Sequence, residues 1–248
     1  MVDPSVIRGL ASVFARSHSD CGNMQETSGR TAILTELAAS GMSRCWYAVK
    51  VQWYESEVQA LEQASKSVNG NRPPVFYGSS SFRLWDSLAE DFDPRVLNLG
   101  FGGSTLQACD HFFARLVPPV HPRSLLLYAG DNDLGDGRSV DEVLGWFRSL
   151  AGQVSTALGP VPFGFVSVKP SPARFPIIDR MRQLNDRVRR EIESRQSGYY
   201  VDVFPAMLDQ SGKPRGELFL DDGLHLSREG YRLWSHLLEP HRNQIFTN

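Results

Sequence analysis

Long apolar stretches are missing from this chain. No uninterrupted apolar run approaches the length that crosses a bilayer, so we expect no integral membrane segment. The first thirty residues hold only a short apolar patch, from Val6 to Phe14, which Arg8 interrupts. An export signal has a longer apolar core than this. These absences predict a cytoplasmic protein.

Cysteine is scarce and scattered. The chain has three, Cys21, Cys45 and Cys109, and none stands in C-x-x-C spacing. An odd number without paired spacing argues against a disulfide framework and against a cysteine-bound metal. We expect buried or inert thiols in a reducing compartment.

Charge of one sign is not in excess either. The 26 basic residues nearly balance the 28 acidic ones, which leaves a net charge of -2. No basic bias draws the chain toward nucleic acid or an anionic membrane, so we expect no nucleic-acid partner. What is present is 248 residues with 41% hydrophobic content, enough for the core of one α/β domain plus an extension.

The N-terminal part has its own pattern. Residues 1–28 are mixed and polar, and we expect them to be poorly ordered. From about residue 31 to residue 65 the pattern is helical, with one apolar stripe made by Tyr47, Val51, Tyr54, Val58 and Leu61. We expect this helix to pack on the main domain. The predicted division is an N-terminal extension over 1–69, partly disordered and then helical, followed by the main domain over 70–248.

Strands and helices alternate from about residue 70. Short apolar runs predict five strands, at 75–77, 95–99, 124–128, 161–168 and 199–204. Helices are expected between and after them, at 105–116 with Ser104 as N-cap, at 139–158, from Pro176 to about 193, and at 227–238. Such alternation indicates right-handed βαβ units and a parallel sheet covered on both faces. The predicted fold class is therefore a three-layer α/β/α domain.

Polar residues follow the ends of these strands. Ser80 comes after the first, Gly103 after the second, Asn132 after the third, and Asp222 and His225 after the fifth. Parallel strands bring their carboxyl ends to one edge, where ligands bind in open α/β sheets. A serine hydroxyl needs a base to become a nucleophile. Among six histidines, only His225 has a carboxylate three residues before it in a Gly-containing loop, so Asp222 can orient its ring.

An oxyanion formed by serine attack needs preorganised hydrogen-bond donors. The Gly103 N–H, the Asn132 side-chain amide and the Ser80 N–H at the opening of a helix are the candidates. Each residue also has a plainer interpretation, such as a serine-rich turn, an Asx turn or a surface ion pair. We expect Asp131 and Asp133 to support their loop, and Lys169 and Arg174 to be ordinary surface residues.

Four sequence blocks carry a family resemblance. They are Gly78-Ser-Ser80, Asn98-Leu-Gly-Phe-Gly-Gly103, Gly130-Asp-Asn-Asp133 and Asp222-Gly-Leu-His225. In this order, each after a predicted strand, they resemble the motifs of the SGNH hydrolases, the GDSL-like esterase/lipase superfamily. The resemblance spans roughly residues 75–235.

The resemblance implies a flavodoxin-like sheet of order 2-1-3-4-5 and a serine esterase without cofactor or metal. Ser80 would be the nucleophile, Asp222 and His225 the other triad members, and Gly103 and Asn132 the oxyanion donors. Ser79 stands where the family usually has Asp. Alignment on Gly78 favours Ser80 over its two serine neighbours, Ser79 and Ser81.

Several functions stay open at this point. Acyl transfer shares the acyl-enzyme, a binding module can keep the fold without activity, and Asp131, Asp133, Asp221, Asp222 and His225 suggest a metal phosphoesterase. A closed metal site lacks support from clustered histidines.

The expected partner is a small ester: an acetyl ester, thioester, lysophospholipid or acetylated sugar. No long apolar lid is evident, which favours short acyl groups. The oligomeric state is undetermined.

Overall fold

The computed structural model describes residues 52–66 and 72–246. The expectations for residues 1–28, Cys21, Cys45, Tyr47 and Val51 fall outside this part. Its centre is one parallel sheet in the order β2-β1-β3-β4-β5. The strands are β1 (Pro74–Gly78), β2 (Leu97–Gly100), β3 (Ser124–Tyr128), β4 (Phe163–Val166) and β5 (Gly198–Val201). The predicted flavodoxin-like order 2-1-3-4-5 is confirmed.

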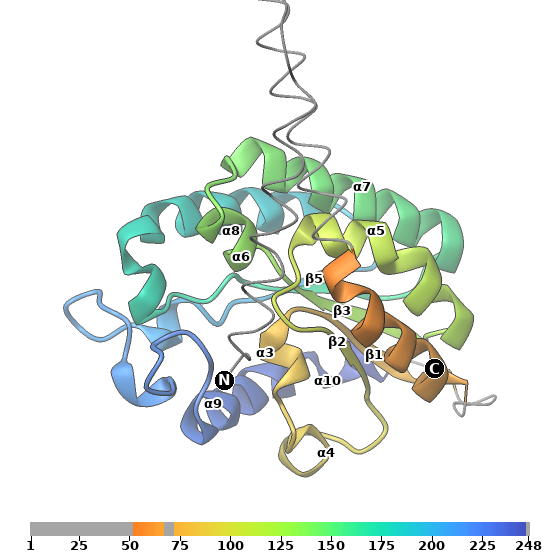
Figure 1. Ribbon diagram of the computed structural model, residues 1–248, viewed down its shortest axis with the longest axis horizontal. Helices are drawn as coiled ribbons and strands as arrows, with labels where there is room; N and C mark the ends of the chain where they lie inside the picture. Colours follow the sequence, from red (N-terminus) through yellow and green to blue (C-terminus); the bar gives the residue numbers. More distant parts are fainter. Residues whose placement is uncertain (1–51, 67–71, 247–248) are drawn as a thin grey trace, which may run out of the picture. The chain divides into compact units, whose positions relative to one another are not determined.

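Helices cover both faces of the sheet (Figure 1). The longer ones are α5 (Leu106–Leu116), α7 (Val140–Leu158), α8 (Ile178–Glu193) and α9 (Arg228–Leu238). Short helical turns are α3 (Ser80–Arg83), α4 (Leu88–Asp91), α6 (Asp131–Gly135) and α10 (Arg242–Ile245). In Figure 1, α5, α7 and α8 lie on one side of the strands, and α9 and α10 on the other.

The strand sequences explain this layering. Along β1, Val75 and Tyr77 belong to the apolar cluster under α5, α7 and α8, whereas Phe76 belongs to the cluster under α9. The same alternation runs along β3, with Leu125 and Leu127 on the first side and Leu126 on the second. Because successive side chains point to opposite faces, a strand buried on both faces is apolar throughout.

Several predicted boundaries were wrong by a few residues. Thr105, not Ser104, caps α5, accepting the Ala108 N–H at 3.0 Å. The fifth strand ends at Val201, because the N–H groups of Val203 and Phe204 donate to the Ser167 hydroxyl rather than to a strand carbonyl.

The fourth predicted strand is likewise shorter, since β4 pairs with β5 only over Phe163–Val166. A 3₁₀ segment, Pro172–Ile177, precedes α8, so Pro176 lies in that segment and not in the α-helix. The helix predicted at 139–158 is α7, which begins with a capping box in which Ser139 and Glu142 hydrogen-bond reciprocally.

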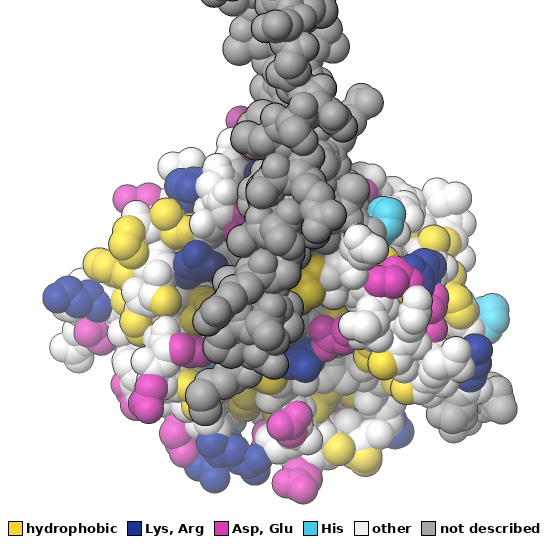
Figure 2. Space-filling view, in the orientation of Figure 1, with side chains coloured by type: hydrophobic (Ala, Val, Ile, Leu, Met, Phe, Trp, Pro, Cys, Tyr) yellow, Lys and Arg dark blue, Asp and Glu magenta, His cyan; other side chains and the backbone are white. Residues whose placement is uncertain are grey.

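The N-terminal helix packs on the domain as predicted, as far as it is described. Residues 52–65 are helical, and Tyr54 and Val58 are buried in the α5 side of the core. The predicted boundary at 69/70 stays a prediction, since residues 67–71 are not described. Within the described part, no helix has the length and apolarity to cross a membrane. Acidic and basic side chains are interspersed on the face shown in Figure 2.

Candidate active site

The first strand ends in a turn that only glycine allows. Gly78 has φ +142°, and a Cβ there would lie 1.9 Å from the Tyr128 carbonyl oxygen of the neighbouring strand β3. The next N–H, that of Ser79, donates to the same oxygen at 2.8 Å. The chain then turns directly into α3, which places Ser80 at the carboxyl edge of the sheet.

Burial separates the three consecutive serines. Ser79 and Ser81 are 0% and 1% exposed, whereas Ser80 is only partly buried. The Ser79 hydroxyl makes no hydrogen bond within the described part of the chain, but its carbonyl accepts from the N–H groups of Phe82 and Arg83. Backbone bonds therefore hold this turn without the carboxylate that the family usually has there. Ser80 is the serine that an incoming molecule can reach.

The loop after β2 is tied to the same turn. The Asn98 side chain donates to the Phe82 carbonyl at 2.6 Å and accepts the Gly100 N–H at 3.0 Å. The loop then passes through Gly102 to Gly103, whose φ of +65° favours glycine. Asn98 thus joins the end of β2 to the helix that Ser80 opens.

Asn132 lies on α6, a short helix that replaces the loop expected after β3. Its side-chain amide donates to the Ser104 carbonyl at 3.1 Å, which joins it to the residue after Gly103. Its backbone N–H donates to the Asp131 carboxylate at 3.1 Å. Two of the predicted site loops, after β2 and after β3, are therefore in direct contact.

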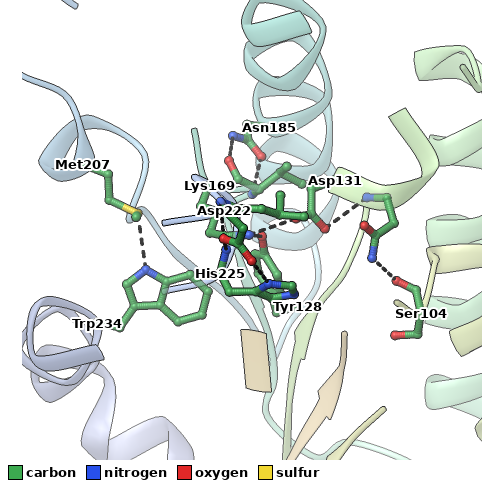
Figure 3. A network of polar contacts seen from close by, with 12 residues as sticks. Ser104, Tyr128, Asp131, Lys169, Asn185, Met207, Asp222, His225 and Trp234 are labelled. Carbon is green, nitrogen blue, oxygen red and sulfur yellow. Dashed lines mark hydrogen bonds and ion pairs between the residues drawn. The ribbon is translucent and has the colours of Figure 1, made fainter. Parts of the chain in front are cut away.

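Lys169 is buried, so the expectation of an ordinary surface role was wrong. It is 1% exposed and pairs with Asp131 at 2.9 Å and with the Tyr128 hydroxyl at 3.2 Å (Figure 3). Burial disfavours both charges, yet the attraction of each partner lowers the pKa of Asp131 and raises the pKa of Lys169. Both shifts favour the ionised pair, which fixes Asp131, the residue next to Asn132.

Asp133 faces the start of α5. Its carboxyl oxygens accept the N–H groups of Leu106 at 2.8 Å and Gln107 at 3.4 Å. N–H groups in the first turn of a helix have no carbonyl partner within the helix, so Asp133 satisfies them from outside. Burial nevertheless raises the pKa of Asp133 to about 7. Both acidic neighbours of Asn132 therefore bond to other parts of the protein, as expected for residues that support the loop.

Asp222 and His225 form a hydrogen-bonded pair, drawn in Figure 3. The Asp222 carboxylate lies 2.6 Å from His225 Nδ1 and also accepts the backbone N–H groups of Leu224 and His225. Burial opposes ionisation of Asp222, but these bonds lower its pKa to about 2. With Nδ1 engaged, the second ring nitrogen of His225 is left for another partner.

The loop that carries this pair docks beside β4. The Ala173 N–H, in the segment after β4, donates to the Gly223 carbonyl at 3.0 Å. All five predicted site residues thus follow the carboxyl ends of strands at one edge of the sheet. Among the described residues, no hydrogen bond joins Ser80 to His225. Catalytic hydrogen bonds are often long before substrate binds.

The described residues contain no group of three His, Cys, Asp or Glu side chains that could hold a metal ion. Of the five residues suggested for a phosphoesterase, Asp131 pairs with Lys169, Asp133 accepts from the start of α5, and Asp222 and His225 bond to each other. The arrangement fits chemistry by a serine and an Asp–His pair.

Known structures share this fold. A Streptococcus pneumoniae protein, provisionally named a platelet activating factor, superposes with a TM-score of 0.66 at 21% identity, over 80% of this chain and 98% of its own. A GDSL-like lipase from Bacteroides thetaiotaomicron gives 0.63 at 21% identity, over 77% and 96%. A Geobacillus acetyl-xylooligosaccharide esterase gives 0.57 at 16% identity, over 73% and 97%. At these identities the likeness shows the fold alone.

A search of curated proteins found no match. The sequence itself gives the family: the model of the GDSL-like Lipase/Acylhydrolase family matches residues 68–233, more than half of the chain. The resemblance read from the four blocks is confirmed, and the chain belongs to the GDSL-like Lipase/Acylhydrolase family, that is, to a family of hydrolases.

Proposed function

We propose that this hydrolase cleaves carboxylic esters through an acyl-enzyme on Ser80. The observation that carries the proposal is the 2.6 Å bond between Asp222 and His225 Nδ1, at the same sheet edge as Ser80, the partly exposed serine of the turn after β1. Asp222 holds the ring in the orientation and tautomer that leave its other nitrogen able to accept a proton. No metal or cofactor is required for these steps.

The reaction has two halves. Ser80 Oγ attacks the ester carbonyl while His225 accepts the hydroxyl proton, and His225 then returns that proton to the departing alcohol. Water next attacks the acyl-enzyme while His225 accepts its proton. His225 then returns that proton to Ser80 Oγ as the acyl–oxygen bond breaks, which releases the acid and the free serine. Asp222 stays ionised throughout, consistent with its lowered pKa.

Three donors would hold the oxyanion in each half: the N–H groups of Ser80 and Gly103 and the amide of Asn132. The bond from Asn132 to the Ser104 carbonyl uses one of the two amide hydrogens and leaves the other for the substrate oxygen. The amide is therefore fixed before substrate arrives, as oxyanion stabilisation requires.

The proposed substrate class draws on the residues that border the site and on the structural relatives. The large apolar side chains that stand out as exposed in the described part are Trp53, Phe175 and Leu220. Two of them lie beside site residues. The Trp53 ring is 3.8 Å from the point where a Cβ on Gly103 would lie, and the Leu220 N–H donates to the His225 carbonyl. We propose a small ester with a short acyl group, and the acetyl-xylooligosaccharide esterase among the structural relatives makes acetylated sugars the first class to test.

Ser80→Ala tests the nucleophile directly. It removes one oxygen from a partly exposed side chain, so the protein should fold with an unchanged melting temperature while hydrolysis of p-nitrophenyl acetate is abolished. Asn132→Ala should lower kcat by about 10²–10³-fold, the loss expected for one oxyanion donor. Wild-type turnover by Ser80→Ala would refute the assignment, and a loss confined to KM would remove Asn132 from the oxyanion hole.

Two further measurements separate the alternatives. Activity that a fluorophosphonate abolishes and a chelator leaves intact would support serine chemistry over metal chemistry. Product analysis with an added alcohol acceptor would show whether the acyl group goes to water, as proposed, or to the acceptor. A series of nitrophenyl esters beside acetylated xylooligosaccharides would give the acyl length and the alcohol.

A further inference from the structure

The helix formed by residues 52–65 lies outside the family match, which begins at residue 68. It nevertheless contacts the loop after β2 at two adjacent residues. We propose that Tyr54 and Glu57 are positioning residues that hold the Gly103 N–H in place for the oxyanion. This inference rests on the proposed function. From its apolar stripe alone, this helix was expected only to pack on the main domain.

The two contacts lie on either side of the proposed donor. The Gly102 N–H donates to the Glu57 carboxylate at 2.9 Å, and the Gly103 carbonyl accepts the Tyr54 hydroxyl at 2.9 Å. The Gly103 N–H belongs to the peptide unit between these two bonded units. Fixing both flanking units fixes the direction of the N–H in the middle.

The loop needs such support because of its composition. Two consecutive glycines have the widest backbone freedom of any dipeptide, and Gly103 stands at φ +65°. An oxyanion donor is effective only if its direction is set before the reaction. A displacement of about 1 Å in an active site can cost about a hundredfold in rate.

Both side chains are themselves held firmly. Tyr54 is 3% exposed, and its ring makes edge contacts with Phe101 and Phe112, at centroid distances of 5.4 and 6.3 Å. Glu57 forms an ion pair with Arg83 on α3, the helix that Ser80 opens. We call Tyr54 and Glu57 together the clamp. Tyr54 anchors it in the core, and Glu57 anchors it on α3, the helix that Ser80 opens.

The same helix offers a matched control. Glu62, five residues after Glu57, pairs with Arg115 of α5 at 2.8 Å, and Glu55 pairs with the same arginine at 2.9 Å. These pairs attach the helix to the domain without bonding to the glycine loop. Glu62→Ala therefore removes a contact of the same chemical kind that serves anchoring alone.

The test uses the full chain with p-nitrophenyl acetate as substrate. Tyr54→Phe removes one oxygen, and Glu57→Ala removes the acceptor of the Gly102 N–H. Each should lower kcat about ten- to a hundredfold with KM essentially unchanged. Inhibition by phenylboronic acid, whose serine adduct places an oxygen in the oxyanion hole, should weaken by a similar factor. Glu57→Gln, which keeps an acceptor oxygen, should retain most of kcat, and Glu62→Ala should retain all of it.

Other results would overturn the inference. These are a wild-type kcat in either Tyr54→Phe or Glu57→Ala, a loss seen only in KM, an equal loss in Glu62→Ala, or no difference between Glu57→Ala and Glu57→Gln. If Glu57→Ala does not fold, Tyr54→Phe decides alone. Ser80→Ala is measured alongside: if it is inactive while the clamp variants are normal, the proposed function stands and the clamp is wrong. If Ser80→Ala is active, the proposed function itself fails.

Discussion

The two loops that carry the proposed oxyanion donors are held in opposite ways. The loop after β3, with Asn132, is fixed by buried side chains, the Asp131–Lys169 ion pair and the Asp133 carboxyl group. The loop after β2, with Gly103, is fixed by side chains from a helix that is partly exposed and outside the family match. One donor thus depends on the interior of the domain and the other on an added element at its surface.

This difference has an energetic meaning. Buried charges are costly to leave unpaired, so the loop after β3 is rigid but intolerant of change. Exposed ion pairs and single hydrogen bonds contribute about 1 kcal/mol or less, so the loop after β2 can be loosened without unfolding the domain. Stability and activity should therefore respond separately to changes on the two sides.

The largest effect is expected from Lys169→Met. Methionine fills much of the volume of lysine but leaves the Asp131 carboxylate buried without its cation. Removing one partner of a buried pair costs about 3–5 kcal/mol. Urea unfolding should show this loss, and activity should fall because Asp131 also holds the Asn132 N–H. The exposed Lys213→Met is the control, expected within about 0.5 kcal/mol of wild type. Equal stability of the two variants would contradict the buried pair.

A smaller effect, visible as a pH dependence, is expected from Asp133→Asn. Burial raises the pKa of Asp133 to about 7 from an ordinary value of 3.8, so the folded state binds its proton more tightly than the unfolded state. The contribution of Asp133 to stability is therefore full below pH 4 and falls as pH rises toward 7. Asparagine keeps an oxygen for the Leu106 N–H and does not titrate.

The measurement is the melting temperature of both proteins at pH 5 and pH 8. Relative to wild type, Asp133→Asn should be more stable at pH 8 than at pH 5. A difference that is constant across this range, or that has the opposite sign, would show that the bonds to α5 outweigh burial and keep Asp133 ionised at both values.

The sequence predicted the candidate residues of the loops after β2 and β3, but not the side chains that hold these loops in place. Glycine, asparagine and the Asp–x–x–His spacing follow local rules, which is why the candidate residues could be found. They are Ser80, Gly103, Asn132, Asp222 and His225. The parallel sheet followed from the alternation of strands and helices, but its order came from the family resemblance and not from any local pattern. Lys169 was misjudged because its partner Asp131 is 38 residues away in the chain, and no local pattern indicates that the two meet.

The clamp was missed for a related reason. In the helical pattern, Tyr54 counted only as a member of the apolar stripe, and Glu57 was not a member of it. Their bonds to Gly103 and Gly102 span 49 and 45 residues. Periodicity tells which face of a helix is buried, but not which loop it lies against. The signal that could have indicated such contacts is the pair of glycines. A backbone with this much freedom can hold an oxyanion donor in place only if other residues fix it.

The smallest effect is expected from Arg115→Gln, and it sharpens the distinction between anchoring and positioning. Arg115 pairs with Glu55 and Glu62, and all three side chains are about one-third exposed. Such pairs contribute about 1 kcal/mol or less and weaken in salt. Melting temperatures should therefore fall slightly at low salt and converge with wild type at high salt. Since Tyr54 and Val58 remain buried, kcat should not change. A large loss of kcat would mean that the exposed pairs, and not the bonds to the glycine loop, determine where the helix holds Gly103.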